Sequence, residues 1–393
     1  MPPDFFQYLY FGSILLLFYS IAGYPLLIGL IAAVTPARRK TAPPSGWELP
    51  SVTMIIPAYN EERVILGKLA NCKEIQYPEG KLEFLVVSDA SSDRTDDLVR
   101  VAAQSFDNLR FLRVEGRVGK TECQNIAVRH SKGEVIVFSD ADSMYFPDAV
   151  MKLAENYVDP RIGGASGRYR YVDPDSSVGE STFVFWEFEN LIKRFQAKIR
   201  TLTGASGCIY SIRKELYEEL PSHISSDIIE PITVVRKGYV IVFEENAKAL
   251  EKPTSRPKQE FGMRVRVVTG GIIGLLYVRD MLNPLRHPWE TFQLFSHKVM
   301  RWMVPVFLIV LFLSNLLLVP RSWWYAATFG GQMAFLLAAF IGWGLDRMGR
   351  PIKWFSLPLF FVLGNAAILT AIYRVLTGYR ATTWETDRRG ITG

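Results

Sequence analysis

Hydrophobic positions follow two different patterns along the chain. Between about residues 50 and 250, short apolar runs alternate with stretches in which polar and apolar residues mix. That pattern is typical of buried strands alternating with helices. Four other stretches are apolar throughout and long enough to cross a bilayer. The pattern therefore predicts an α/β domain accompanied by membrane-spanning segments.

The first apolar stretch, Leu9–Val34, carries no charge over about 26 residues. That length spans a hydrocarbon core of roughly 30 Å with some tilt. The stretch is too long for a signal-peptide core and lacks a small-residue cleavage site, so we expect a retained anchor. With three later candidates, the sequence predicts an integral membrane protein with about four transmembrane helices. The later candidates are Met303–Pro320, Trp323–Leu345 and Trp354–Tyr373.

Four short apolar runs predict the strands of the α/β domain. Because helical stretches alternate with them, we expect a parallel, Rossmann-like sheet that binds ligands at the carboxyl ends of its strands. No G-x-G-x-x-G follows the first run and the chain has no Walker A motif, which argues against a dinucleotide dehydrogenase. The runs are Val52–Ile56, Phe84–Val87, Leu109–Val114 and Val135–Phe138.

The last of these runs, Val135–Phe138, is apolar on both faces and predicts a buried, central strand. Asp140 and Asp142 follow its carboxyl end with Ala141 between them. Strand alternation would aim both carboxylates the same way, so that they could share one hard cation carrying phosphate oxygens. An isolated Asp-x-Asp is more often a solvated turn, but its position after a buried strand favours the metal site.

Charge and cysteine content narrow the functional classes. The net charge of +6 lies largely beside the membrane segments. Arg38, Arg39 and Lys40 directly follow the first span and place the middle of the chain in the cytoplasm. No basic stripe interleaved with aromatic residues occurs, so nucleic-acid binding is the weaker interpretation. The three cysteines are widely spaced and fit buried thiols in a reducing compartment.

Several motifs stand in a fixed order along the α/β region. They are PAYNEE from Pro57, SDASSD from Ser88, RVGK from Arg117 with Asn125, and SDAD from Ser139. Together they resemble the nucleotide-sugar half of family 2 glycosyltransferases with a GT-A fold. TGASG (203–207) resembles the acceptor-side loop of the family, and Ser226-Asp227 the stretch that carries the catalytic base. The resemblance covers roughly residues 50–270, and the membrane segments suit the branch of cellulose, hyaluronan and poly-N-acetylglucosamine synthases.

The resemblance implies roles for individual residues. Asp140 and Asp142 would hold Mg²⁺ or Mn²⁺ at the diphosphate of the donor, and Asp89 would accept a hydrogen bond from its nucleobase. Asp227 would take the proton of the acceptor hydroxyl in an inverting transfer. The other residues implied in substrate binding are Pro57, Ala58, Tyr59, Glu61, Arg117, Lys120, Ala141, Ser206 and Gly207.

Some of these residues have simpler interpretations. Asp89 could cap a helix, and Glu61 could lie in the first turn of a helix and complement its dipole. Arg117 and Lys120 could belong to a solvated basic loop.

The chain departs from the family at two places. Ser226 stands where many members have an acidic residue. The stretch before the later membrane helices also lacks the Gln and the Trp of a Gln-x-x-Arg-Trp motif, although it contains Arg264 and Arg266. These arginines could clamp departing phosphates or face lipid headgroups. Without the Trp, addition of one or a few sugars is as plausible as polymerisation.

We therefore expect six regions. They are a transmembrane anchor (1–34), a linker (35–50), a cytoplasmic GT-A domain (51–257), interfacial amphipathic helices (258–300), C-terminal transmembrane helices (301–376) and a tail (377–393). Residues 183–200 could form another interfacial helix or a core helix. His297, Lys298 and Arg301 are expected to form an interfacial belt rather than to bind ligands.

The expected activity is that of an inverting, metal-dependent hexosyl- or N-acetylhexosaminyltransferase in the cell membrane. The expected donor is a nucleotide-diphosphate sugar, with a UDP-sugar favoured. The acceptor would be a glycan or a lipid-linked saccharide for surface or extracellular polysaccharide. Alternatives are a processive synthase that extrudes its product, a polyprenyl-phosphate glycosyltransferase, or a non-enzymatic nucleotide-sugar-binding membrane subunit. The presumed base, Asp227, argues against the last of these.

Overall fold

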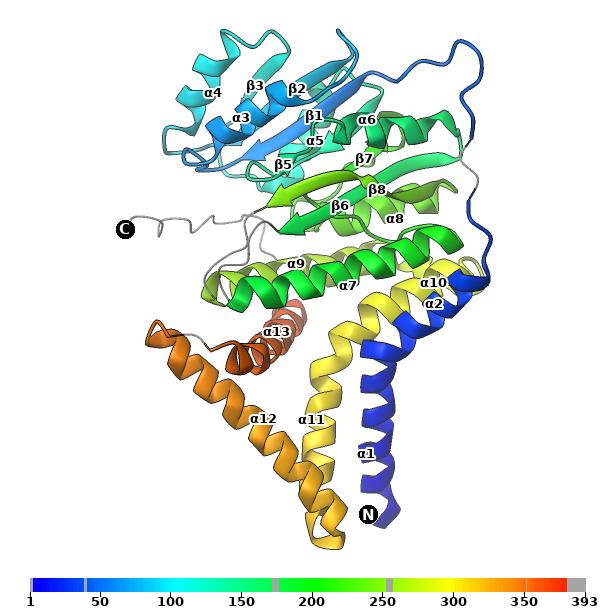
Figure 1. Cartoon of the computed structure of the whole chain (residues 1–393), viewed down its shortest axis with the longest axis vertical. Coiled ribbons are helices and arrows are strands. Elements are labelled where there is room, and N and C mark those ends of the chain that lie inside the picture. The colour runs from blue at the N-terminus through cyan, green and yellow to red at the C-terminus, as the bar shows by residue number, and fades with distance from the viewer. Residues whose placement is uncertain (1–2, 39–40, 172–176, 252–256, 351, 380–393) are drawn as a thin grey trace.

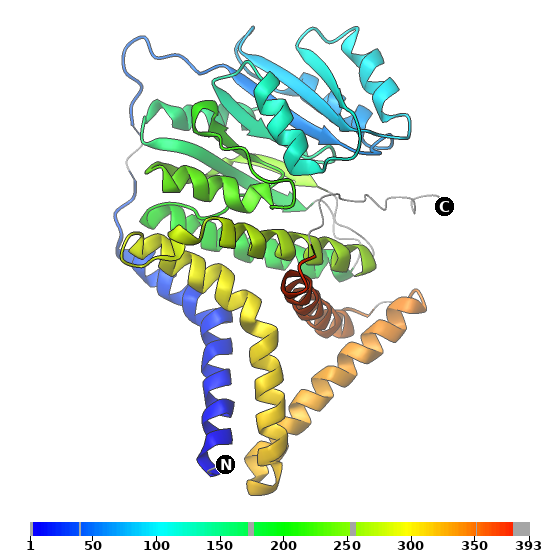
Figure 2. The same cartoon turned by 180° about the vertical axis from the view of Figure 1, so that it is seen from behind.

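The structure is a computed structural model that describes residues 3–38, 41–171, 177–251, 257–350 and 352–379. Figure 1 shows three layers, which Figure 2 repeats from behind. An α/β domain forms one end, two long helices lie across its underside, and apolar helices extend away from them. Most of the expected tail lies outside the described residues.

The α/β domain is built on one eight-stranded sheet of order β3-β2-β1-β4-β7-β6-β8-β5. The first four strands of the chain run parallel, as the alternating pattern predicts. However, β7 runs antiparallel to β4, so the sheet is mixed rather than parallel throughout. The strands are β1 (Val52–Ala58), β2 (Leu82–Asp89), β3 (Leu109–Val114), β4 (Val135–Phe138), β5 (Met144–Tyr145), β6 (Ile162–Tyr171), β7 (Tyr210–Arg213) and β8 (Val240–Glu251).

Strand β4 lies between β1 and β7 and is buried on both faces. Its side chains alternate: Val135 and Val137 join the core on one face of the sheet, and Ile136 and Phe138 join the core on the other. This alternation explains why the run lacks polar residues. The prediction of a central strand is confirmed.

Helices cover both faces of the sheet. One face carries α3 (Ile65–Glu74), α4 (Thr95–Ala103) and α6 (Ala149–Ala154) with the 3₁₀ turn Glu155–Val158. The other face carries α5 (Lys120–His130) and α8 (Ser226–Arg236). A further 3₁₀ turn, Lys214–Leu216, follows β7.

Two long helices, α7 (Ser177–Ile199) and α9 (Pro257–Tyr277), form the middle layer in Figure 1. Gly270 and Gly274 of α9 lie against Ser225 and Ile229 and leave no room for a Cβ, which lets α9 approach α8 closely. The core of the second face continues through Leu275, Met281 and Leu294. The middle layer is therefore packed into the domain rather than tethered to it.

Four helical segments are long and apolar enough to cross a membrane within the described residues, as the sequence predicts. The first joins α1 (Pro3–Phe18) to α2 (Tyr24–Val34) through a π-helical turn, Tyr19–Gly23. The second joins α10 (Pro288–Leu294) to α11 (Met300–Leu318) through a π-helical turn, Phe295–Val299. The other two are α12 (Trp323–Arg347) and α13 (Lys353–Leu376), and the remaining 3₁₀ turns are Arg279–Leu282 and Val319–Arg321.

The two π-helical turns contact each other. The Tyr19 hydroxyl lies 2.7 Å from Ser296 Oγ. Insertions of this kind bend helices, and both helical segments change direction side by side in Figure 1 and Figure 2. The bends carry α2 and α10 against α7 of the middle layer.

The interfacial belt expected at His297 and Arg301 is contradicted. His297 is 4% exposed, and its Nε2 lies 3.3 Å from Glu189 Oε2 of α7. Arg301 forms an ion pair with the same carboxylate. A buried carboxylate requires a charged partner, and Arg301 supplies it instead of facing lipid headgroups.

Candidate functional site

The first part of the candidate site lies at the carboxyl end of β4. Asp140 and Asp142 are both half-buried, and Lys120 at the start of α5 forms an ion pair with Asp140. Burial lowers the pKa of Lys120, but the Asp140 and Asp227 carboxylates outweigh this effect and raise it. The pairing keeps an ammonium group beside the Asp-x-Asp turn.

Lys68, which the sequence analysis did not identify, supports this turn through hydrogen bonds. Lys68 of α3 is fully buried. Its Nζ donates to Ser139 Oγ at 2.8 Å and also to the carbonyl oxygen of Ser143. Lys68 therefore holds both ends of the turn that carries Asp140 and Asp142. In the sequence it is indistinguishable from a surface lysine of an amphipathic helix.

Glu251, at the end of β8, is a third acidic residue that sequence reasoning missed. Burial raises the pKa of Glu251 well above its usual range, and the Asp142 and Asp140 carboxylates raise it further. These effects favour the protonated form of Glu251, which can donate in its hydrogen bond with Asp142. The antiparallel pairing of Met144 in β5 with Leu250 in β8 brings this residue close to the acidic turn.

The acidic turn suits a hard divalent cation shared with a substrate. Carboxylate oxygens are the ligands that Mg²⁺ and Mn²⁺ prefer. Within the described ranges, no cluster of three or more His, Cys, Asp or Glu side chains is arranged to hold a metal. A cation here would therefore be held by Asp140 and Asp142 together with substrate phosphates, a common arrangement for Mg²⁺.

Asp89 ends β2 and is fully buried. It accepts hydrogen bonds from the backbone N–H of Val118 at 2.7 Å, from that of Gly119 at 3.1 Å and from Arg117 Nε at 3.2 Å. Gly119 has φ 95°, a conformation that favours glycine. Asp89 thus shapes the basic loop rather than capping a helix, and its contact with a nucleobase stays a prediction.

The basic loop reaches the end of β1. The Arg117 guanidinium lies 3.2 Å from the centre of the Tyr59 ring. Ala58 is buried at the end of β1, directly after Pro57. Glu61 is also buried, but α3 begins only at Ile65, so Glu61 does not lie in the first turn of a helix.

On the other side of the acidic turn lie the loop 203–207 and Asp227. Asp227 is half-buried in the first turn of α8. Its backbone oxygen accepts a hydrogen bond from the N–H of Ala205 at 3.0 Å. Gly207 lies against its side chain, and Lys193 Nζ of α7 donates to Ser206 Oγ at 2.6 Å. The structure thus brings the acceptor-loop candidates and the candidate base together.

Arg266 completes the centre of the site. Burial lowers the pKa of Arg266, and the Asp140 and Asp227 carboxylates oppose that shift. Lys120 interacts electrostatically with the same two carboxylates. Two basic groups therefore lie close enough to the same two carboxylates to interact with both, a combination of charges suited to a phosphate group beside a proton acceptor.

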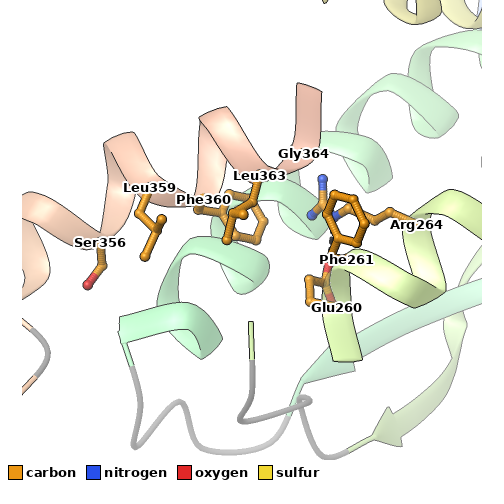
Figure 3. A pocket seen from close by; sticks show the side chains of 8 residues that line it. All are labelled: Glu260, Phe261, Arg264, Ser356, Leu359, Phe360, Leu363 and Gly364. Carbon is orange, nitrogen blue, oxygen red and sulfur yellow. Dashed lines mark hydrogen bonds and ion pairs between the residues drawn. The ribbon is translucent and has the colours of Figure 1, made fainter. Parts of the chain in front are cut away.

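Arg264 lies elsewhere. Its Nε donates to Glu260 Oε1 at 2.7 Å, and its guanidinium lies 4.4 Å from the centre of the Phe360 ring of α13. Figure 3 shows Arg264 at an apolar pocket between α9 and α13, which is lined by Phe261, Ser356, Leu359, Leu363 and Gly364 among others. Of the two arginines expected at phosphates, the structure places only Arg266 with the acidic residues.

Known proteins resemble this chain in sequence and fold. Residues 53–221 match the family described as glycosyl transferase family 2. The probable glycosyltransferase YdaM of Bacillus subtilis is 28% identical over 264 residues, which cover 63% of this chain and 61% of the relative. The chain thus aligns with less than two thirds of that relative. Poly-beta-1,6-N-acetyl-D-glucosamine synthase of Staphylococcus aureus is 25% identical over 289 residues, which cover 72% of this chain and 69% of the relative.

One solved structure resembles nearly the whole chain. It is the mannosyltransferase PcManGT from Pyrobaculum calidifontis, in complex with GDP-Man and Mn²⁺. Its TM-score is 0.72 at 22% sequence identity, and the match covers 94% of this chain and 99% of that chain. The expected GT-A fold is confirmed by this likeness.

Proposed function

We propose that this chain, which contains a glycosyl transferase family 2 domain at residues 53–221, transfers a sugar from a nucleotide-diphosphate sugar to a glycan or lipid-linked saccharide at a membrane. One observation carries the proposal. Asp140 at the end of β4 and Asp227 at the start of α8 both interact with Lys120 and Arg266. A donor diphosphate and an acceptor hydroxyl would therefore meet between them.

The donor would lie along the carboxyl ends of β1, β2 and β4. Tyr59 and Arg117 offer an aromatic and a cationic surface to the nucleobase, beside the loop that Asp89 holds. Pro57, Ala58 and Glu61 would line the nucleoside. Lys120 and Arg266 would bind the diphosphate, with Asp140 and Asp142 holding Mg²⁺ or Mn²⁺. That cation, when bound, would act as a Lewis acid that stabilises the leaving diphosphate.

In the chemical step, the acceptor oxygen attacks the anomeric carbon while the bond from that carbon to the diphosphate oxygen breaks. Asp227 takes the proton of the attacking hydroxyl as this happens. Because the attack comes from the face opposite the leaving group, the anomeric configuration inverts. Gly207 and the N–H of Ala205 fix Asp227 against the acceptor loop, so the base can remain in position between turnovers.

Two observations bear on the nucleotide of the donor. A UDP-sugar is the sequence-based expectation, while the similar solved mannosyltransferase holds GDP-Man. Both nucleotides belong in the first test. The polymer-forming Staphylococcus aureus relative favours a processive synthase as the second candidate function. Transfer onto a polyprenyl phosphate is less favoured, because an ionised phosphate needs no base such as Asp227.

We place the α/β domain in the cytoplasm and the apolar helices in the cell membrane. Four candidate spans support membrane embedding, and the basic residues after the first span support the orientation. The proposed division keeps 1–34 as anchor, 35–50 as linker, 51–257 as catalytic domain, 258–300 as interfacial region, 301–376 as membrane helices and 377–393 as tail.

The test uses full-length protein purified in detergent and a panel of UDP- and GDP-sugars, with Mn²⁺ or with EDTA. We expect nucleotide release from one donor with Mn²⁺ and none with EDTA. Product size on the same samples separates single addition from polymerisation. Failure to bind any nucleotide would contradict the proposal.

A further inference from the structure

Two lysines contact the loop 203–207, which also contacts the candidate base. Lys193 Nζ of α7 donates to Ser206 Oγ at 2.6 Å. Lys298 Nζ, from the π-helical turn before α11, lies 3.6 Å from the position that a Cβ of Gly204 would occupy. The intervening Ala205 and Gly207 contact Asp227 instead. Gly204 and Ser206 thus contact the lysines, whereas Ala205 contacts the backbone of Asp227 and Gly207 its side chain.

The lysines lack a carboxylate of their own. Glu189, the buried acid of α7, pairs with Arg301 and His297. Across the described parts of the chain, neither Lys193 nor Lys298 forms an ion pair within 4.0 Å. Lys193 is only 6% exposed, whereas Lys298 is half-buried. A buried ammonium without a carboxylate in ion-pair contact is unfavourable. Because Glu189 already pairs with Arg301, this arrangement favours an anion from outside the chain.

The pKa of Lys193 reflects the same shortage of contacting carboxylates. Burial lowers the pKa of Lys193 to about 8; Glu189 opposes the shift and the nearby Lys298 ammonium adds to it. A bound anion would remove the repulsion between the two ammonium groups and stabilise both charges.

The lysines lie on the membrane side of the site. Lys193 belongs to the middle layer of Figure 1, and Lys298 lies within the candidate membrane span Pro288–Arg321, in the turn that precedes α11. Donor phosphates would lie beyond the loop, at Lys120 and Arg266. An anion that reaches Lys193 and Lys298 would therefore come with the acceptor, from the membrane.

We propose that Lys193 and Lys298 bind the phosphate or diphosphate that links the acceptor saccharide to its lipid carrier. This inference rests on the proposed function, because it identifies the anion as part of the acceptor. The headgroup phosphates would contact both ammonium groups, while the saccharide hydroxyl reaches Asp227 past Ser206 and Gly207. The acceptor class is thus a lipid-linked saccharide rather than a free glycan.

The test measures binding without any nucleotide sugar. Full-length protein in detergent is titrated with farnesyl diphosphate, inorganic pyrophosphate, farnesol and phosphatidylglycerol. We expect farnesyl diphosphate to bind, and the other three to bind at least about tenfold more weakly. Lys193→Met and Lys298→Met should each weaken farnesyl diphosphate binding by about tenfold or more, the usual scale for removing one partner of a desolvated charge contact. The control Lys132→Met removes an exposed lysine before the amino end of β4 and should change nothing.

The possible results separate the alternatives. Equal binding of pyrophosphate would indicate a free-anion site and overturn the proposal, as would equal binding of phosphatidylglycerol. Binding that neither lysine variant weakens would also overturn it, provided that both variants keep the wild-type affinity for nucleotide as evidence of folding. If the donor panel shows turnover but farnesyl diphosphate does not bind, only this inference fails. If farnesyl diphosphate binding depends on the lysines but no donor is turned over, only the proposed function fails.

Discussion

Gly207 lies so close to Asp227 that a Cβ added to it would be 2.9 Å from Asp227 Oδ2. Gly207→Ala must therefore displace the carboxylate. We expect kcat for sugar transfer to fall by about tenfold or more, since small displacements of a catalytic group are costly. Nucleotide affinity should not change. The matched control is Gly262→Ala in α9, where no atom lies within 4 Å of the added Cβ. An unchanged kcat in Gly207→Ala would argue against Asp227 as the base.

Arg264 and Arg266 differ by two positions but should differ in function. Arg266→Met is expected to weaken binding of nucleoside diphosphate by about tenfold, because it removes a cation that interacts with Asp140 and Asp227. Arg264→Met should have a smaller effect on that affinity. It should lower the melting temperature instead, since Arg264 bonds to Glu260 and contacts Phe360. Calorimetric titration with UDP and GDP tests which variant loses more nucleotide affinity. A larger loss in Arg264→Met than in Arg266→Met would contradict the prediction.

Glu230 should make stability depend on pH. Burial raises its pKa to about 8, and it accepts a hydrogen bond from the Tyr210 hydroxyl at 2.5 Å. Between pH of about 4.5 and 8 the folded protein therefore binds more protons than the unfolded chain, so stability falls as pH rises through this window. Glu230→Gln removes the titration and should be more stable than wild type at pH 8.5 by about 1–2 kcal/mol.

Thermal unfolding at pH 5, 6.5 and 8.5 measures this difference. The gap between Glu230→Gln and wild type should widen with pH. Glu219→Gln, at an exposed carboxylate, serves as the control. A gap that stays constant over the range would show that Glu230 does not titrate in this window.

Lys68 should stabilise the acidic turn. Lys68→Met leaves Ser139 Oγ and the Ser143 carbonyl without their buried donor. We expect a loss of about 1–3 kcal/mol in the free energy of unfolding, together with weaker Mn²⁺-dependent nucleotide binding. The exposed Lys132→Met provides the comparison in chemical denaturation. If Lys68→Met unfolds like wild type, the turn does not depend on this lysine.

The sequence predicts those parts of the fold that depend on local patterns. The central position of Val135–Phe138 follows from its apolar character on both faces, and the four candidate spans follow from length and composition. The antiparallel strand β7 could not be predicted in the same way, because strand direction depends on connections between distant elements.

The same limit applies to the candidate site. The motifs around Asp89, Asp140 and Asp227 mark strand and helix ends, so the sequence reveals them. Lys68 and Glu251 reach the acidic turn only through tertiary packing and therefore have no local signal. Arg301 was expected at an interface because it precedes an apolar span, but a buried carboxylate in α7 pairs with it instead.

The most direct test of the central claim compares sugar transfer by wild type and Asp227→Asn, with nucleotide affinity measured on the same samples. A general base contributes about 10²- to 10⁴-fold to a rate. We therefore expect Asp227→Asn to lose about a hundredfold or more of kcat while it binds nucleotide as tightly as wild type. Asp280→Asn, in the 3₁₀ turn that follows α9, should retain full activity. Wild-type kcat in Asp227→Asn would contradict the account of the site.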